Sequence, residues 1–532
     1  MGMKAVPEII PLGDGARCWA HAFESFRVKV YVPREDPLAD TVNFGFKAPY
    51  LLVFEETERS MEDAVRFAEE SGLAEIARQY STSVVSVFPA SGSWETASPF
   101  LFADLIAESR IHEYFRDGVV TAKNRFTGLW EDCFIRGAIY RTCVYGFGAS
   151  ADWLARNCMK TLQGQYLWGP GEITPAVLSL ERLSVMPAPE REDIPVISVG
   201  NPEEIDRALG HSCRHLLIKR EAEYAKDFRC FAGRWRRWCG VLQEEEDMDA
   251  LGMTEEPAYE TVRTSPDNRG DDQGTEEHRI GYVAYYNKDL FSRGPVPLLL
   301  AFHGGGDSAF YIADISGWYR IAHKYGFLLV SVENHLNSTA AETVELIEKL
   351  KKKYPVDEHR IYASGFSMGG CKSWDLMQEY PQVFAALAPM DATFEVGLNL
   401  YGQKAPKEIN SSVPVPVFYA GGEITPLPEL PFQAEKCLER IRWLFGVNRV
   451  KTPYSVRFED RENWPEKIWG IRGDRVEKTD DPSRGSVLTV NLFESEDGVF
   501  RTALASISGQ GHECREHTCD RAWRFMAQFT RR

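Results

Sequence analysis

A seventeen-residue segment of the first half of the chain recurs in the second half, and this repeat limits the possible folds more than any other feature. Residues 71–87, SGLAEIARQYSTSVVSV, align without gaps with residues 316–332, SGWYRIAHKYGFLLVSV, and 8 of the 17 positions are identical. In both copies a helix-like stretch leads into an apolar, strand-like one. The repeat therefore predicts two domains of related architecture.

Three shorter pairs of segments follow the same order along the two halves. They are 48–56 with 296–304, 145–153 with 364–372, and 194–201 with 415–422. The second half also alternates short apolar runs with helical stretches, which is typical of a mainly parallel sheet covered by helices on both faces. Strands are expected at 279–286, 297–302, 327–332, 360–364, 384–388, 415–419 and 503–507.

An acidic stretch with little apolar periodicity lies between the halves. Residues 244–247 are EEED, and residues 265–277 are SPDNRGDDQGTEE, a composition typical of a solvated connector. We therefore predict a first domain at 1–242, an acidic linker or long loop at 243–278, and a second domain at 279–532. The 532 residues are enough for two hydrophobic cores.

The charge and the apolar runs of the chain restrict its partners. With 61 basic and 78 acidic residues the net charge is -17, which repels phosphate backbones, so nucleic acid is not expected as a partner. The start of the chain has no apolar core of signal-peptide length, and no later run is long enough for a membrane span. We expect a cytoplasmic protein without a membrane partner. The 11 cysteines have no paired metal-knuckle spacing, which suits reduced, buried thiols.

The motif GFSMG places a serine between a short apolar strand and a helix-like stretch. It lies within RIYASGFSMGG at 360–370, with Ser367 at its centre. A serine on a sharp strand-to-helix turn needs small neighbours two positions away on each side, because the backbone is strained and the side chain must stand clear. The helix N-terminus also favours negative charge that develops beside it. Ser367 is therefore the candidate nucleophile.

A run of glycines ends an earlier strand, in FHGGG at 302–306. Glycines allow backbone N–H groups to turn into a site, where they can stabilise an oxyanion. We predict that the N–H groups of Gly304 or Gly305, together with that of Met368, form this oxyanion hole.

A histidine and a carboxylate are needed to activate the serine. His512, in SGQGHE between the last expected strand and the last helix, is predicted to be the base, and His517 to be a surface or capping residue. Glu423, in the turn GGEITP after a strand, is the favoured acid. Asp391, in APMDATF after the preceding strand, is the alternative.

Several large side chains near these motifs are candidates for substrate contact, although such residues more often pack in a core. The candidates are His303, Trp318, His335, Phe366 and Trp374.

The motifs of the second half resemble those of the α/β-hydrolase superfamily, and within it the polyhydroxybutyrate depolymerase and feruloyl-esterase-like branch. The resemblance covers roughly 279–532 and rests on FHGGG at 302–306, SGFSMGG at 364–370 and GQGHE at 509–513. It implies an α/β-hydrolase fold and hydrolysis of carboxylic esters through an acyl-enzyme on Ser367, with no cofactor and no metal. The expected partner is a small or oligomeric ester, and the oligomeric state stays open. A peptidase or acyltransferase on the same fold is the alternative, followed by a non-catalytic binding protein.

The alignment of the halves predicts that the first half lacks the same chemistry. Gly148 stands at the place of Ser367, and Glu56 at that of Gly304, while no histidine matches His512. We therefore predict that the first half is a degenerate, non-catalytic α/β-hydrolase-like domain.

Overall fold

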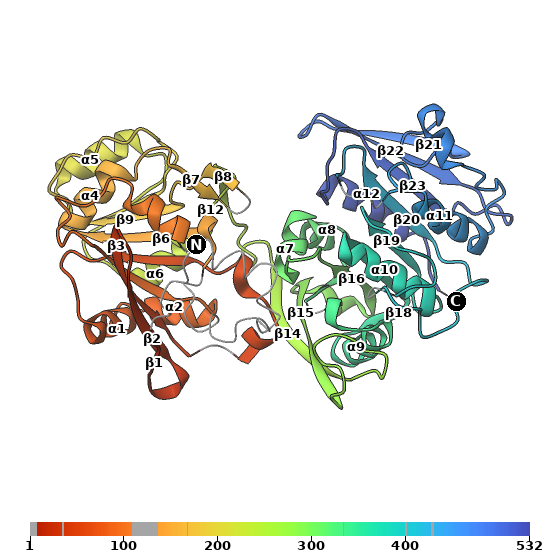
Figure 1. Cartoon of the computed structure of the whole chain (residues 1–532), viewed down its shortest axis with the longest axis horizontal. Helices are drawn as coiled ribbons and strands as arrows, with labels where there is room; N and C mark the ends of the chain where they lie inside the picture. Colours follow the sequence, from red (N-terminus) through yellow and green to blue (C-terminus); the bar gives the residue numbers. More distant parts are fainter. Residues whose placement is uncertain are drawn as a thin grey trace. The chain divides into compact units, whose positions relative to one another are not determined.

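The chain forms two compact units, shown in a computed structural model (Figure 1). One unit consists of residues 1–39 and 44–247, and the other of residues 40–43 and 248–532. The structure describes residues 8–34, 37–108, 137–166, 169–333, 335–399, 402–426 and 430–531.

The predicted linker at 243–278 is corrected in part, because residues 253–263 and 277–278 belong to the sheet of the second unit. Strand β14 (Met253–Arg263) pairs along its whole length with β15 (Glu277–Asn287) in antiparallel register. β14 is the edge strand and is mostly half-buried, so it carries many polar residues and lacks the apolar run of a central strand. One of its acids, Glu256, accepts hydrogen bonds from Tyr286 and Tyr354, both at 3.0 Å.

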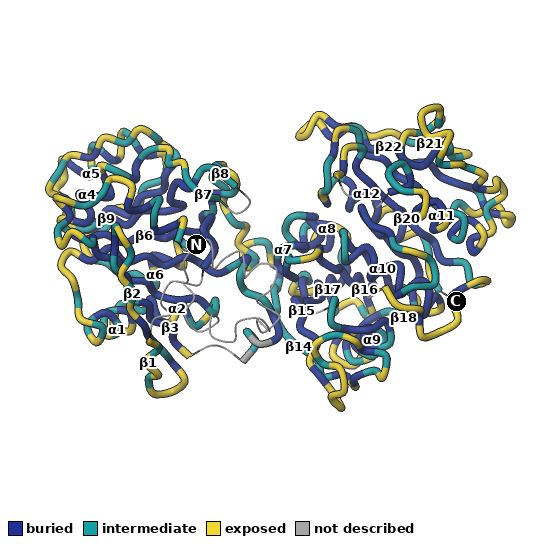
Figure 2. Tube along the Cα trace, in the orientation of Figure 1, coloured by how far each residue is buried: buried dark blue, intermediate teal, exposed yellow. Residues whose placement is uncertain are grey.

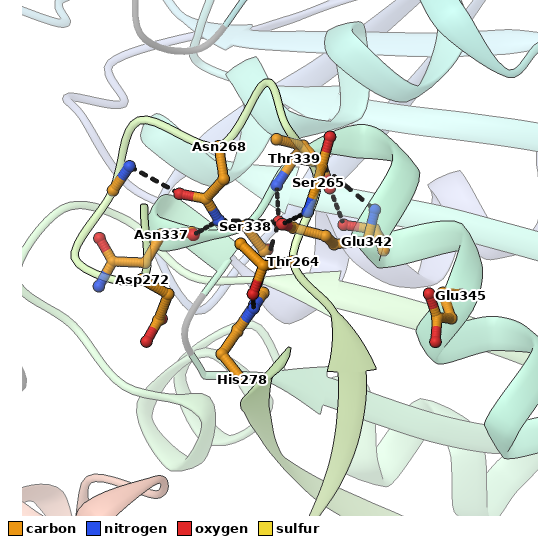
Figure 3. A network of polar contacts seen from close by, with 12 residues as sticks. Thr264, Ser265, Asn268, Asp272, His278, Asn337, Ser338, Thr339, Glu342 and Glu345 are labelled. Carbon is orange, nitrogen blue, oxygen red and sulfur yellow. Dashed lines mark hydrogen bonds and ion pairs between the residues drawn. The ribbon is translucent and has the colours of Figure 1, made fainter. Parts of the chain in front are cut away.

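Residues 264–276, between β14 and β15, form a hairpin loop held by a buried carboxylate (Figure 3). Glu342, in the first turn of α9 (Ala340–Lys353), accepts the backbone N–H of Ser265 at 2.7 Å and the amide of Asn268 at 3.0 Å. The same side chain accepts the N–H of Thr339, whose hydroxyl in turn accepts the N–H of Glu342, so the helix begins with a capping box. This loop is therefore folded onto the start of α9.

The second unit contains a sheet of ten strands, of which the central five pairs, from β17 to β23, are parallel. Its order is β14, β15, β17 (Leu328–Val332), β16 (Val296–Phe302), β18 (Val356–Phe366), β19 (Ala386–Met390), β20 (Val417–Gly422), β23 (Thr502–Ile507), β22 (Ser486–Phe493) and β21 (Arg475–Asp481). This order, with a crossover at β17 and β16 and helices between the parallel strands, is that of an α/β-hydrolase fold. The fold prediction for the second half is confirmed.

Helices cover both faces of this sheet. Successive side chains of a strand point to opposite faces. Ile361 and Ala363 of β18 lie in a core with residues of α9, α10 (Met368–Glu379) and α11 (Lys436–Val447). Tyr362, between them, contacts Trp523 of α12 (Glu516–Met526), with ring centroids 5.3 Å apart. Helix α12 therefore packs on the face opposite to α9, together with α8 (Trp318–Tyr325), to which Lys324 and Asp520 join it at 2.8 Å.

The first unit repeats the strand order of the second. Its sheet runs β1 (Ile10–Pro11), β2 (Arg17–Ala22), β3 (Phe26–Val32), β5 (Val84–Pro89), β4 (Tyr50–Phe54), β6 (Thr142–Phe147), β9 (Val177–Glu181), β10 (Val196–Val199) and β11 (Leu216–Lys219). From β2 to β11 each pair has the same direction as its counterpart from β14 to β23. Its helices include α1 (Met61–Glu70), α2 (Leu73–Gln79), α4 (Ala149–Asn157), α5 (Glu203–Ser212) and α6 (Tyr224–Cys230).

The sequence repeat corresponds to one helix-and-strand unit in each half. Residues 71–87 span α2 and β5, and residues 316–332 span α8 and β17. Each helix is preceded by a glycine in the left-handed conformation, Gly72 with φ 77° and Gly317 with φ 67°. The two halves thus share backbone geometry at the aligned glycines as well as strand order.

The most buried elements of both units are the central parallel strands (Figure 2). Every residue of β4 and β16 is buried, which explains why these strands are continuous apolar runs without alternation. The helices within the described ranges are too short or too polar to cross a membrane.

Candidate active site

Ser367 lies on a strained turn between β18 and α10. Its backbone has φ 53° and ψ -120°, a conformation that costs a side chain with a Cβ atom free energy. Two hydrogen bonds fix the turn: Ser367 N–H donates to the Met390 carbonyl, and Cys371 N–H donates to the Ser367 carbonyl, both at 3.0 Å. The serine is partly exposed at the N-terminus of α10. The turn therefore has the strand-to-helix geometry that its motif predicts for a nucleophile elbow.

The glycines around the serine are required by close backbone packing. A Cβ atom on Gly365 would lie 2.0 Å from the Gly369 carbonyl oxygen, and one on Gly369 would lie 2.1 Å from the Phe302 carbonyl oxygen. These carbonyls belong to the backbone and cannot swing away, so a larger residue at either place must displace a strand or the helix.

We expect Gly369→Ala to destabilise the second unit by more than about 3 kcal/mol, because the added methyl group overlaps the carboxyl end of β16. Gly446→Ala is a matched control in α11, since nothing lies within 4 Å of its Cβ position. That control should stabilise the unit by about 0.5–1 kcal/mol through helix propensity. Urea unfolding of both variants measures the difference, and equal stabilities would contradict the packing argument.

His512 lies beside the elbow, on the loop between β23 and α12. Its ring packs on that of Phe366, with centroids 4.6 Å apart and planes inclined by 38°. Its Nδ1 atom faces two oxygens, each at 3.3 Å: Oδ2 of Asp391 and Oγ1 of Thr425. Since Nδ1 faces these groups, Nε2 is left for the serine. His517 is a residue of α12 instead.

The carboxylate beside His512 is that of Asp391 and not that of Glu423. Asp391 follows β19 with φ 51°, is buried, and accepts the N–H of Gly422 at 3.1 Å through Oδ1. Its other oxygen, Oδ2, lies 3.3 Å from Nδ1 of His512. Burial raises the pKa of Asp391, and His512 opposes this rise.

Glu423 follows β20, as expected, but its side chain is directed elsewhere. Its carboxylate forms an ion pair with Lys467 at 3.3 Å and is partly exposed, and its N–H donates to the Ile507 carbonyl. The structure therefore does not bring the favoured candidate, Glu423, to the imidazole. The alternative, Asp391, is the carboxylate that the structure brings to the imidazole.

The glycine loop after β16 lies against the elbow. A Cβ atom on Gly305 would be 3.3 Å from Cγ of Met368, and one on Gly304 would be 3.3 Å from Cδ1 of Phe366. Among the described residues, no backbone carbonyl accepts the N–H of Gly304 or Gly305. The loop thus brings backbone donors beside the first turn of α10, where the predicted oxyanion hole requires them.

A buried histidine orients this loop. The Nδ1 and Nε2 atoms of His303 lie 2.7 Å from the carbonyl oxygens of Gly304 and Glu333, respectively. Carbonyl and N–H of one peptide point in opposite directions. A proton on Nδ1 that holds the Gly304 carbonyl therefore turns the N–H of Gly305 the other way. His303 is a loop-positioning residue and not the substrate contact that we expected.

The other predicted contact residues divide between core and site. Trp318, His335 and Trp374 are almost fully buried; Trp374 donates to the Ala392 carbonyl at 3.0 Å, and His335 packs on the His303 ring. These three are corrected to core residues, because their large rings fill space between sheet and helices. Phe366 differs from these three because its ring packs on that of His512 and so lies at the site.

Glu333, beside His303, gives the second unit a pH-dependent stability. Burial raises the pKa of Glu333 from 4.5 to about 8, although the N–H groups of Ala309 and Asn43 donate to it. Between these pH values the folded state binds a proton that the unfolded state has released, so stability falls as pH rises through this window.

We expect Glu333→Gln to remove this loss. The difference in unfolding temperature between the variant and the wild type should grow by about 5 °C from pH 5 to pH 8. The reason is that the amide of glutamine does not ionise in the folded or the unfolded state. Glu348→Gln, at an exposed site on α9, is the control. It should change the unfolding temperature by the same amount at pH 5 and at pH 8. Differential scanning calorimetry checks this, and parallel wild-type and Glu333→Gln curves would refute it.

The first unit keeps the elbow backbone but fills the site with an ion pair. Gly148 has φ 51° and ψ -118°, within 2° of Ser367 in both angles. A Cβ atom on Gly148 would lie 2.0 Å from Oε1 of Glu56. Arg182, with φ 54°, follows β9 as Asp391 follows β19, and it pairs with Glu56 at 2.7 Å.

The first serine after Gly148 offers no substitute nucleophile. Ser150 is fully buried, and its hydroxyl donates to the Phe54 carbonyl at 2.6 Å while accepting the Phe147 N–H at 2.8 Å. Its role is to tie the elbow to β4.

Comparisons with known proteins point to esterases. No family model matches the chain. A bifunctional acetylxylan esterase/xylanase, XynS20E, of Neocallimastix patriciarum is 29% identical over 135 residues, which are 24% of this chain and 19% of that protein. The chain thus spans about a fifth of the length of this curated relative.

Two solved structures are also similar in part. An acetyl xylan esterase from Aspergillus awamori is 14% identical with a TM-score of 0.33, covering 51% of this chain and 99% of its own. A ferulic acid esterase is 14% identical with a TM-score of 0.27, covering 37% of this chain and 86% of its own. The strand order of the second unit is that of an α/β-hydrolase fold, and part of the chain is similar in sequence to an esterase.

Proposed function

We propose that the second unit hydrolyses carboxylic esters by way of an acyl-enzyme on Ser367. The observation that supports this most is the elbow conformation of Ser367 beside a histidine whose Nδ1 faces a buried carboxylate. His512 accepts the serine proton through Nε2 as the hydroxyl attacks the carbonyl carbon, and Asp391 stabilises the imidazolium that forms.

The remaining steps use the glycine loop and water. The N–H groups of Gly305 and Met368, or Gly304 in place of Gly305, donate to the oxyanion of the tetrahedral intermediate. His512 then returns the proton to the leaving alcohol and afterwards activates water, which attacks the acyl-enzyme and releases the acid. No step needs a metal or an organic cofactor.

Small acetyl esters of sugars are the substrate class that we favour within this proposal. The support is the name of the curated relative, an acetylxylan esterase/xylanase. The partner is thus a small or oligomeric ester, and the net charge of -17 argues against nucleic acid.

The first unit has no catalytic part in this proposal. The Glu56–Arg182 pair occupies the space above Gly148 that a nucleophile would need. We infer a duplicated hydrolase domain that has lost its chemistry.

A comparison of leaving groups separates an esterase from a peptidase. The full chain should hydrolyse p-nitrophenyl acetate, while p-nitroacetanilide should show no hydrolysis above the background of Ser367→Ala. Faster cleavage of the anilide would favour the peptidase. Transfer of the acetyl group to an added alcohol in preference to water would favour the acyltransferase. Acetate release from acetylated xylo-oligosaccharides then tests the substrate class.

A further inference from the structure

The Nδ1 atom of His512 has a second oxygen partner that the triad does not include. Oγ1 of Thr425 lies 3.3 Å from Nδ1, the same separation as Oδ2 of Asp391. Thr425 is only 5% exposed, so bulk water does not replace its hydroxyl. The two oxygens come from the ends of β19 and β20, which are neighbours in the sheet.

Backbone hydrogen bonds hold Thr425 in place. Its N–H donates to the Gly422 carbonyl at 3.4 Å, and its carbonyl accepts the side-chain amide of Gln433. The adjacent N–H of Ile424 donates to the Gln510 carbonyl at 3.0 Å, which ties this turn to the loop of His512. The hydroxyl therefore faces the imidazole from a fixed backbone.

The chemistry of His512 and Asp391 decides which nitrogen of the imidazole carries the proton. A neutral imidazole carries one proton, and the carboxylate of Asp391 accepts only, so it favours the tautomer with the proton on Nδ1. Thr425 Oγ1 then acts as a second acceptor for the same N–H. Nε2 is left unprotonated and can take the proton of Ser367.

We propose that Thr425 is a positioning residue of His512, whose hydroxyl helps to hold the imidazole in the orientation that leaves Nε2 to the serine. This inference rests on the proposed function, because it concerns the same serine, histidine and acid. Residue 425 already faces Nδ1, whereas Glu423, two residues earlier on the same turn, pairs with Lys467.

The test compares Thr425→Val with Thr425→Ser on p-nitrophenyl acetate. Valine keeps the shape but removes the acceptor, so kcat should fall about tenfold with KM unchanged, as for one lost hydrogen bond. Serine keeps the oxygen and should restore kcat to within about threefold of the wild type. A valine variant as active as the wild type, or a serine variant no better than valine, overturns the proposal.

A measurement on Ser367→Ala separates this inference from the proposed function. If Ser367→Ala retains activity, the proposed function fails. If Ser367→Ala is inactive while Thr425→Val is as active as the wild type, only the inference about Thr425 fails.

Discussion

Ser367→Ala is expected to lower kcat/KM for p-nitrophenyl acetate by about 10⁴-fold or more and to abolish labelling by a fluorophosphonate probe. The methyl group of alanine cannot attack the carbonyl, and the oxyanion donors alone leave little rate enhancement. The elbow should survive the change, since alanine adopts the strained backbone at the same cost as serine. Circular dichroism and the unfolding temperature should therefore match the wild type.

The first unit supplies the matched control for this experiment. Glu56→Gln and Arg182→Gln break the ion pair above Gly148, and both should leave kcat/KM within about twofold of the wild type, as expected for surface changes away from the reacting atoms. If Ser367→Ala kept activity while either of these variants lost it, the active site would lie in the first unit.

Asp391→Asn should lower kcat by about 10³-fold, while Glu423→Gln should change it by less than about threefold. An asparagine can present its NH₂ group to Nδ1, which favours the tautomer with the proton on Nε2, and that imidazole cannot accept the proton of Ser367. The glutamine at 423 loses only a partly exposed ion pair with Lys467.

Asparagine tolerates the positive φ of residue 391, so this variant should fold. KM should stay near the wild-type value in both variants, because neither carboxylate is placed against the substrate. A larger loss of kcat in Glu423→Gln than in Asp391→Asn would indicate that Glu423, after β20, is the acid.

Local motifs were enough to place the serine, the histidine and the glycine loop. The elbow glycines are dictated within a few residues of Ser367, since carbonyls at 2.0 and 2.1 Å leave no space for a Cβ atom on Gly365 or Gly369. Continuous apolar runs also revealed strands such as β16, because a strand buried on both faces contains little else. The repeat predicted related architectures in the two halves because it consists of whole helix-and-strand units.

Edge elements were missed because they do not need an apolar pattern. β14 carries acids that pair with tyrosines and a lysine, and its loop is held by Glu342, which lies far along the chain. The sequence shows the acidic residues but not the partners that make them part of the sheet.

The sequence alone thus determined the fold class and identified Ser367 and His512 as the candidate nucleophile and base, since each depends on neighbours along the chain. Only the tertiary structure decided which carboxylate lies beside His512. Asp391 and Glu423 both follow strands of one sheet, and parallel strands bring both ends to the same edge, so spacing cannot choose between them. The choice depends on which side chain turns toward His512, and that is set by Gly422, which holds Asp391, and by Lys467, which pairs with Glu423.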